Sequence, residues 1–549
     1  MIGFQDYRTV SLVVERHLDT VEVRGSSPLR CTSIIKNMDT QNSQSYIPVK
    51  APLMAGISFA LGLLFDYFFY GKIPGIGFPI YVCLLLVGLF VISKYSERQI
   101  NKQALWLLVP LIFFSSMVFV RSSALLTFLN VVASLLLLLL VAEVSFAGLL
   151  KNLLVGDYVK IIFLPLEFIR PFFQTLPNIF MFREVSTGPK VSSQVVKGII
   201  LAIPVILIFL ALFSSADLIF QKYLSDLIHI AIKPQTVFRS IHVFCATSAL
   251  IGAYSYALGK KENSTIPSTT SDKSHTVGHI ETSILLGAVN VLFFAFILVQ
   301  LTYLFGGEGN IASQGFTYAE YARKGFFELI AVAIISFLLL LTTEKYTAKK
   351  DTEHTLIFKI LSMALFVQVI LIMVSAFKRL FLYEEAYGFT TLRLYSHAFI
   401  IFLAIIFILL LYKIYKDKRE NAFAFRAFVS IVVFLTVMNI LNPDVFIARR
   451  NIERFATTGK LDTYYLSSLS DDAVPETVKI LNISNKDLKK SFARDLYWRT
   501  QYDSYFFSQW QSFNISRMNA DNILKSKMTD LEQYKDYQQQ NVNSIVPNE

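Results

Sequence analysis

The stretch ALLTFLNVVASLLLLLLVAEVSFAG, residues 124–148, decides the fold class of this chain. It contains six consecutive leucines and a single ionisable side chain, Glu143. An α-helix rises about 1.5 Å per residue, so roughly 20 apolar residues cross a hydrocarbon core about 30 Å thick. The stretch therefore predicts a helix that spans a lipid bilayer.

Similar apolar runs occur throughout the chain. We count eleven: 51–70, 78–94, 103–120, 124–148, 197–214, 237–258, 283–304, 326–342, 355–376, 396–413 and 423–440. The composition agrees, because 54% hydrophobic and 17% charged residues could not cover a water-exposed globular surface. The sequence predicts an all-α, polytopic helical membrane protein with about eleven transmembrane helices and a small helical C-terminal extracytoplasmic tail.

The basic residues predict the orientation of the helices. With the N-terminus placed in the cytoplasm, the cytoplasmic connections contain twenty Lys and Arg residues and the opposite connections contain nine. Cytoplasmic loops of membrane proteins carry the excess of Lys and Arg. We therefore expect a multi-pass protein of the cell membrane with a cytoplasmic N-terminus and an extracytoplasmic C-terminus. The same rule explains the net charge of +11, so no nucleic-acid partner is expected.

Changes in composition divide the chain further. The loop 149–196 mixes apolar and basic residues with prolines, which is typical of a segment lying against the anionic inner leaflet. The predicted parts are a first transmembrane bundle at 38–258 with this interfacial loop, a disordered cytoplasmic linker at 259–282, a second bundle at 283–440, a helical extracytoplasmic tail at 441–530 and a disordered end at 531–549.

Residues 1–37 differ from the rest of the chain. Gly25-Ser26-Ser27-Pro28 is what results when the T-arm of a transfer-RNA gene is translated. We interpret 1–37 as a mis-assigned extension, with the true start at Met38. An ordinary disordered leader is the alternative.

Charged residues beside apolar segments are concentrated in the outer connections. They are Asp217, Glu320, Arg323, Arg393, Asp444 and Arg449. Because charges near lipid are costly without a partner, we expect them to meet in one ion-paired network. Such a network would lock the tail to the helices or form the wall of a binding site. The alternative is an ordinary aromatic belt with solvated ion pairs.

Three acidic residues fall inside the predicted helices or at their ends, namely Asp66, Glu143 and Glu328. Asp66 and Glu143 lie away from the helix centres, so we expect solvation at the membrane interface for both. The amides Asn130 and Asn290 are expected to form hydrogen bonds between helices.

The tail shows helix boundary signals. Asp444 follows Asn442-Pro443 at an expected helix start, Gly459 marks a stop, and Asp472 is expected to cap a helix whose first turn contains Pro475. Because this helix follows the last span without a linker, we expect the tail to pack against the outer connections.

Motifs for a metal site, a nucleotide loop or a serine nucleophile do not occur in the sequence. The three cysteines, Cys31, Cys83 and Cys245, are too scattered for a disulfide framework. We therefore predict no cofactor and no metal.

Several motifs together resemble one family. They are SSADLIF, TYAEYARKGFFEL, YGFTTLRLY, NPDVFIARRN, LDTYYLSSLSDDAVP and WQSFNISRMNA, in this order from about the fourth span to Ala520. The chain resembles an uncharacterised bacterial family of multi-pass membrane proteins that is catalogued as a domain of unknown function. The resemblance implies a fold of many helices and no particular activity, substrate or catalytic residue.

Three classes of function stay open. The first, which we favour, is a non-enzymatic sensor or scaffold of the bacterial cell envelope that meets a partner through its outer tail. The second is a transporter or flippase. Two features of the sequence argue against it, the lack of internal repeats and the lack of a deeply buried charged pair. The third is a membrane transferase for a lipid-linked substrate, with Asp217, Glu320 and Arg393 as acid, base and anion clamp.

Overall fold

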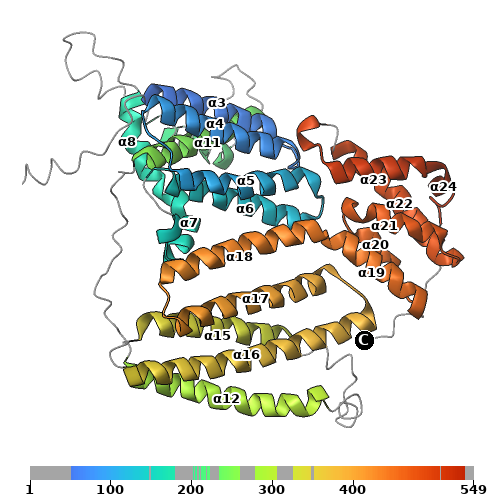
Figure 1. Cartoon of the computed structure of the whole chain (residues 1–549). Coiled ribbons are helices and arrows are strands. Elements are labelled where there is room, and N and C mark those ends of the chain that lie inside the picture. The colour runs from blue at the N-terminus through green and yellow to red at the C-terminus, as the bar shows by residue number, and fades with distance from the viewer. Residues whose placement is uncertain are drawn as a thin grey trace, which may run out of the picture. The chain divides into compact units, whose positions relative to one another are not determined.

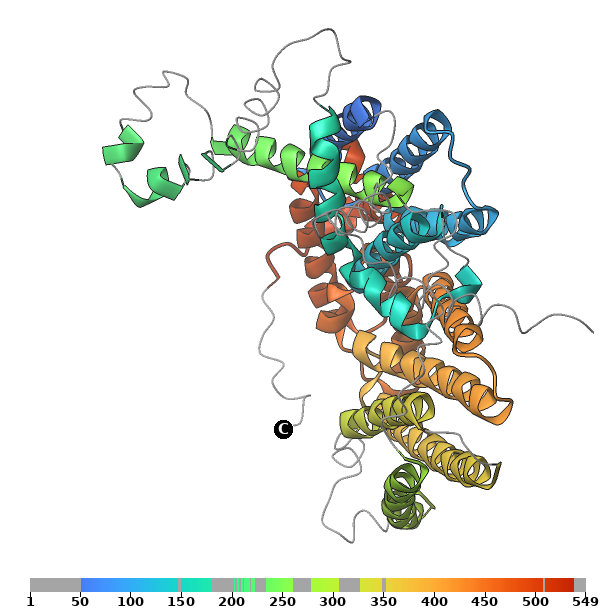
Figure 2. The same cartoon turned by 90° about the vertical axis from the view of Figure 1, so that its left-hand side faces the viewer.

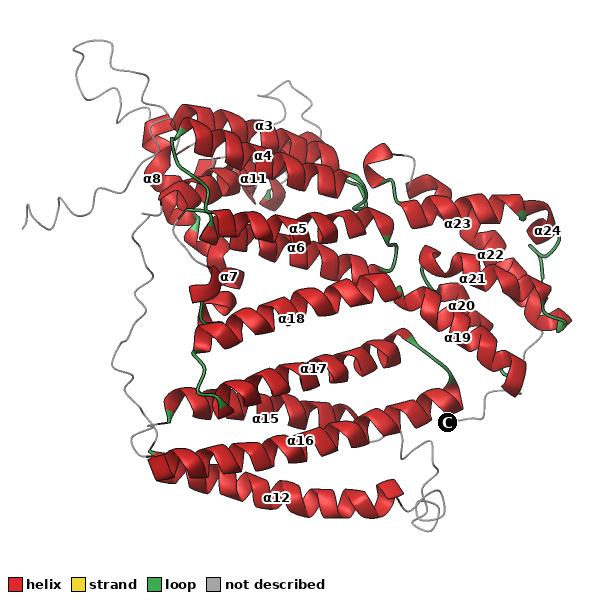
Figure 3. Ribbon diagram, in the orientation of Figure 1, coloured by secondary structure: helices red, strands yellow, loops and turns green. Residues whose placement is uncertain are grey.

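A computed structural model describes residues 51–146, 150–179, single residues and short pieces between 202 and 222, 234–259, 278–305, 326–347, 352–506 and 509–537. The elements that it describes are helices, joined by loops and turns (Figure 3). This confirms the predicted all-α class.

Ten described helices are long and apolar enough to cross a membrane. They are α3 (Ala51–Phe69), α4 (Gly77–Tyr95), α5 (Lys102–Val120), α6 (Ala124–Val144), α11 (Pro234–Gly259), α12 (His279–Phe305), α15 (Phe326–Tyr346), α16 (Thr352–Tyr387), α17 (Thr391–Tyr415) and α18 (Glu420–Leu441). Each matches a predicted run. The eleventh run, 197–214, lies mostly outside the described residues.

The directions of the helices bear on that eleventh crossing. Helix α3 runs antiparallel to α11, since Asp66 pairs with Arg239 while Ser255 contacts Met54. Helix α8 (Ile169–Ile179) meets the far end of α11, where Thr175 and Ser255 are hydrogen-bonded at 2.8 Å. The chain leaves α8 at one face and enters α11 at the other. The crossing predicted for 197–214 stays a prediction.

The spanning helices bury two apolar cores. One core lies among α3, α4, α5, α6 and α11, and the other lies among α12, α15, α16 and α17. Helix α18 contributes Leu435 and Met438 to the first core and Phe423 to the second. We call the helices around these cores the first and the second helix group. In Figures 1 and 2, α18 lies between them. We call the end that carries residues 70–76 and 121–123 the tail face, and the other end the opposite face.

Short helices occupy the predicted interfacial loop at the opposite face. Helix α7 (Val155–Glu167) packs against α18, where the rings of Tyr158 and Phe428 stack at 5.4 Å. Other apolar side chains of α7 and α8 stay exposed, among them Phe163 and Phe173. Their contact with the lipid surface remains a prediction.

The tail folds into a small helical layer with its own core, around Ile447, Phe492 and Leu524. Its elements are α19 (Pro443–Thr458), α20 (Thr463–Ser468), α21 (Val474–Thr477), α22 (Lys486–Phe506), α23 (Ile515–Ser526) and α24 (Met528–Glu532), with short 3₁₀ turns between them. Helix α19 begins at Pro443 and ends at Thr458, just before Gly459, whose φ of 65° suits glycine. Both predicted boundaries are confirmed.

The tail is seated directly on the turn between α3 and α4. The amide of Ile76 donates to the Phe513 carbonyl at 2.9 Å, and the Trp510 indole donates to the Tyr67 hydroxyl at 3.3 Å. A Cβ at Gly75 would lie 2.5 Å from the Ser512 carbonyl carbon. Glycine is therefore required here because two backbones touch.

Gly75→Ala should push the tail away from this turn and destabilise the protein by about 1–3 kcal/mol, the usual cost of overpacking. Gly56→Ala is the control, because a Cβ there meets no atom within 4 Å. Thermal unfolding in detergent measures both variants. Equal unfolding temperatures would show that the tail does not rest on the turn.

Candidate functional site

A buried carboxylate joins the tail to the membrane helices. Asp472 lies in a 3₁₀ turn, Asp471–Ala473, and its side chain is fully shielded from solvent. One carboxylate oxygen accepts hydrogen bonds from the amides of Ser122 and Ser123 at 2.7 and 3.0 Å. These amides belong to the short connection between α5 and α6. Asp472 therefore binds an inter-helix connection, whereas the sequence predicted that it would cap a helix of the tail.

Other polar groups complete the shell of Asp472. Its second oxygen accepts from the Ser516 hydroxyl at 2.5 Å and lies 3.9 Å from the Arg121 guanidinium. Ser470 and Asn442 also donate, at 3.3 and 3.5 Å. Asn514 donates to the Arg121 carbonyl at 2.9 Å, and Asp444 accepts from the Ser470 amide. We call the whole set the tail junction: Arg121, Ser122, Ser123, Asn442, Asp444, Ser470, Asp472, Asn514 and Ser516.

Arg121 connects the tail junction to the interior of the helices. Its guanidinium donates twice to the Asn439 carbonyl, at 3.0 and 2.7 Å. The Asn439 side chain exchanges two hydrogen bonds of 2.8 Å with Asn130, and both amides are completely buried. The predicted role of Asn130 between helices is confirmed. Asn290 also bonds across helices, to the Leu361 carbonyl at 3.1 Å.

Asp444 is the second buried carboxylate of the tail junction. It is 4% exposed and accepts a hydrogen bond from the Ser470 amide at 3.2 Å. Burial raises the pKa of the Asp444 carboxyl, and the nearby charge of Asp472 raises it further. Hydrogen bonds from Ser470 and Ser123 act in the other direction but do not outweigh burial.

A second set of tail contacts holds the turn between α16 and α17. The Asn451 side chain accepts from the Phe389 amide and donates to the Phe389 carbonyl, both at 2.8 Å. The Tyr465 hydroxyl accepts from the Thr391 amide at 2.7 Å. Gly388 has a φ of 84°, and a Cβ there would lie 2.6 Å from the Asn451 oxygen. The tail thus binds connections from both helix groups.

The predicted ion-paired network is not what the described members form. Arg393 donates to the Gly388 carbonyl at 2.5 Å and stacks on the Tyr383 ring at 4.1 Å. Arg449 pairs with Glu476 at 3.0 Å. Hydrogen bonds from Lys479 and from Arg449 lower the pKa of the Glu476 carboxyl. Asp217 accepts from the amides of Ile219 and Phe220. No ion pair joins these three or Asp444 to one another, because nearer groups satisfy each one.

Glu320 and Arg323 lie outside the described residues, so their contacts stay predictions. Glu328 is described and is exposed in the first turn of α15.

Two of the intramembrane acids, Asp66 and Glu143, have protein partners. Asp66 is 6% exposed and binds Arg239 at 2.5 Å, so the expected interfacial solvation was wrong for this residue. Arg239, on the neighbouring helix α11, offsets the charge of Asp66 in place of water. Glu143 accepts from the Tyr256 hydroxyl at 2.9 Å.

Sequence reasoning missed several buried polar pairs of the second helix group. The His397 ring lies 3.2 Å from Glu384, and the two are 9% and 3% exposed. Arg379 and Ser375 donate to the Gln300 oxygen at 2.8 and 3.0 Å. Lys413 and Glu344 form a further buried ion pair. Ionisable residues within apolar runs were the available signal, but their partners are 13 to 79 positions away.

The tail junction is suited to holding the tail and not to acid-base chemistry. The Asp472 oxygens accept from so many donors that little capacity is left for a substrate. Asp444 is buried and accepts a hydrogen bond from the Ser470 amide. Within the described part of the chain, no group of three His, Cys, Asp or Glu side chains could hold a metal ion.

One family model matches the chain, at residues 108–480, and its description is "Domain of unknown function (DUF4153)". The match begins within α5 and ends after α21, so it includes most of the tail junction. No curated protein and no solved structure matches the chain.

Asp472→Ala should cost about 3–5 kcal/mol, because it leaves the Ser122 and Ser123 amides without their acceptor and the half-buried Arg121 without its carboxylate partner. Asp521→Ala, which removes an exposed ion pair with Lys525, is the control and should change little. Unfolding in detergent and protease cleavage within 445–500 measure the effect. Wild-type stability and wild-type protease cleavage of Asp472→Ala would show that Asp472 does not hold the tail on the helices.

The pKa of Asp444 predicts a pH dependence. The pKa of Asp444 is higher in the folded state than in the unfolded state. The contribution of Asp444 to stability is therefore complete at pH values below its pKa in the unfolded state. It is lost as the pH rises through its pKa in the folded state. Asp444→Asn removes this loss, so its unfolding temperature should rise relative to wild type between pH 4 and pH 8. A difference that stays constant with pH would contradict the assignment.

Proposed function

Because the chain belongs to the DUF4153 family, a domain of unknown function, we propose its role from its own geometry: a non-enzymatic scaffold or sensor of the bacterial cell envelope. The helices hold the tail as a fixed platform, and a partner protein binds that platform. The observation that carries this proposal is the attachment of the tail to connections of both helix groups through Asp472 and Asn451.

The attachment supports a fixed platform for a physical reason. A tail that only followed the last span would need no contacts with connections more than 300 residues away, such as that between Asp472 and Ser122. Buried charge-assisted hydrogen bonds are costly to break, so the platform keeps one orientation. A fixed orientation is useful for presenting a binding surface to a partner.

Exposed aromatic side chains on the tail support the binding role. Tyr464 is 81% exposed and Trp498 is 46% exposed, although neither lies on a membrane-spanning helix. Large aromatic side chains are enriched at protein interfaces.

Photo-crosslinking in growing cells tests the platform. A photoreactive residue at Tyr464 should give one discrete protein adduct, and Asp472→Ala should abolish it at equal membrane levels. Ile440 is the control position, because it is 70% exposed on a spanning helix. Equal adducts at both positions, or none at Tyr464, would overturn the scaffold proposal.

We also propose that the tail face is extracytoplasmic. The opposite face carries the basic connection 416–419, in keeping with the positive-inside rule. In a parent without Cys31, Cys83 and Cys245, a membrane-impermeant maleimide should label Tyr464→Cys in intact cells. It should label Lys418→Cys only after lysis. The reverse pattern would invert the assignment.

A second function, transport, is favoured by one observation. The buried Glu384–His397 pair lies within the spanning helices, and intramembrane ionisable groups commonly mark ion or proton paths. Liposomes containing wild-type protein should then lose an imposed pH gradient faster than those containing Glu384→Gln. Glu385→Gln is the matched control, since Glu385 is next to Glu384 in the chain but is exposed. Equal rates for all three proteins would exclude this path.

A further inference from the structure

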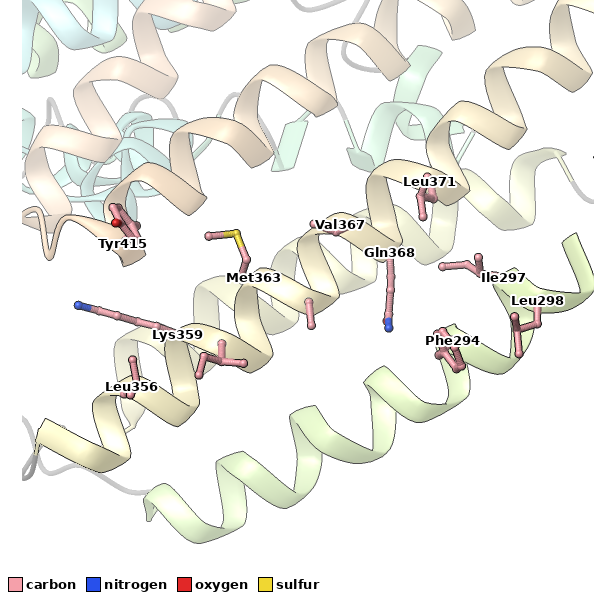
Figure 4. A pocket seen from close by; sticks show the side chains of 12 residues that line it. Phe294, Ile297, Leu298, Leu356, Lys359, Met363, Val367, Gln368, Leu371 and Tyr415 are labelled. Carbon is pink, nitrogen blue, oxygen red and sulfur yellow. The ribbon is translucent and has the colours of Figure 1, made fainter. Parts of the chain in front are cut away.

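An apolar groove of about 700 Å³ lies along α16 in the second helix group. Its lining comes from α12, α16 and α17, with Phe294, Ile297 and Leu298 on one side and Met363 and Val367 on the other (Figure 4). These helices are all candidate membrane spans. The groove therefore lies at membrane depth, where lipid chains are the available apolar occupant.

The two ends of the groove differ chemically. Leu371 and Ile297 line one end, and Lys359 and Tyr415 line the other (Figure 4). Lys359 is held at this end by Asp417, with its Nζ 2.5 Å from the carboxylate. The same connection between α17 and α18 exposes Lys416, Lys418 and Arg419. These cations outnumber the acid that holds Lys359, so the polar end favours an anion.

The length of the groove fits one lipid leaflet. From Lys359 to Leu371 the helix rises roughly 18 Å, and half of a hydrocarbon core about 30 Å thick is similar. Between the ends, Gln368 donates its Nε2 to the Asn290 carbonyl at 3.2 Å. This bond ties α16 to α12 along the groove and leaves the remaining wall largely apolar.

We propose that the groove binds an anionic phospholipid of the leaflet at the opposite face. The acyl chain lies along α16 between Val367 and Phe294. The phosphate lies beside Lys359 and the Tyr415 hydroxyl, within reach of the basic connection 416–419. Every apolar groove in a membrane is covered by lipid chains, so preference for one headgroup distinguishes a binding site from the surrounding bilayer.

Native mass spectrometry of the full chain measures this preference. The purified protein is given equal amounts of phosphatidylglycerol and phosphatidylcholine with identical chains. Wild type should retain phosphatidylglycerol in clear preference. Lys359→Gln should lower that preference by about fivefold, the usual contribution of one cation near anionic lipid. Lys72→Gln, on the tail face, is the control for charge and should leave the preference unchanged.

Filling the groove provides an independent test. Val367→Trp should expel most of the bound phosphatidylglycerol. Val374→Trp on the same helix is the matched control, because Val374 is 54% exposed and does not line the groove. Equal retention by these two variants, or equal retention of both lipids by wild type, would overturn the proposal. If Val367→Trp does not fold, Lys359→Gln decides alone.

Discussion

The Asp472 carboxylate is the interaction on which the arrangement of the tail depends. It is removed from water and binds the amides between α5 and α6, the Ser516 hydroxyl and Arg121. A buried carboxylate is stable only when its oxygens are satisfied. The turns that supply those donors must therefore meet at one place, which fixes three segments distant in the sequence.

The same requirement operates inside the membrane helices. Lipid supplies no hydrogen bonds, so each polar side chain there needs a partner from the protein. Asn130 meets Asn439, Asp66 meets Arg239, and Glu384 meets His397. These pairs specify which helices are neighbours, whereas the apolar contacts around them are less selective. Helix α18 illustrates this, because Asn439 links it both to α6 and, through Arg121, to the tail junction.

Three of the sequence motifs quoted above acquire a physical meaning in the structure. NPDVFIARRN supplies Asn451 and the buried Asp444, and YGFTTLRLY supplies the turn that Asn451 holds. LDTYYLSSLSDDAVP supplies Asp472 and Tyr465. Most of these residues attach the tail to the helices. The motifs therefore describe a structural joint, which explains why none of them resembles a catalytic signature.

The sequence by itself determined the class of the protein and the positions of its helices. Length and hydropathy suffice for this, because a span is a local property that the bilayer thickness imposes. The boundaries of α19 at Pro443 and Gly459 were likewise local. The partners of the polar residues were decided only by tertiary structure. Asp472 was expected to cap its own helix, but two backbone amides that it accepts from, those of Ser122 and Ser123, lie 350 and 349 residues earlier. Asp66 was expected in solvent, but Arg239 reaches it from α11. Arg393 and Asp444 were expected to belong to one ion-paired network, but each is satisfied by nearer groups. Charge pairing depends on which helices and turns become neighbours, and no local pattern contains that information.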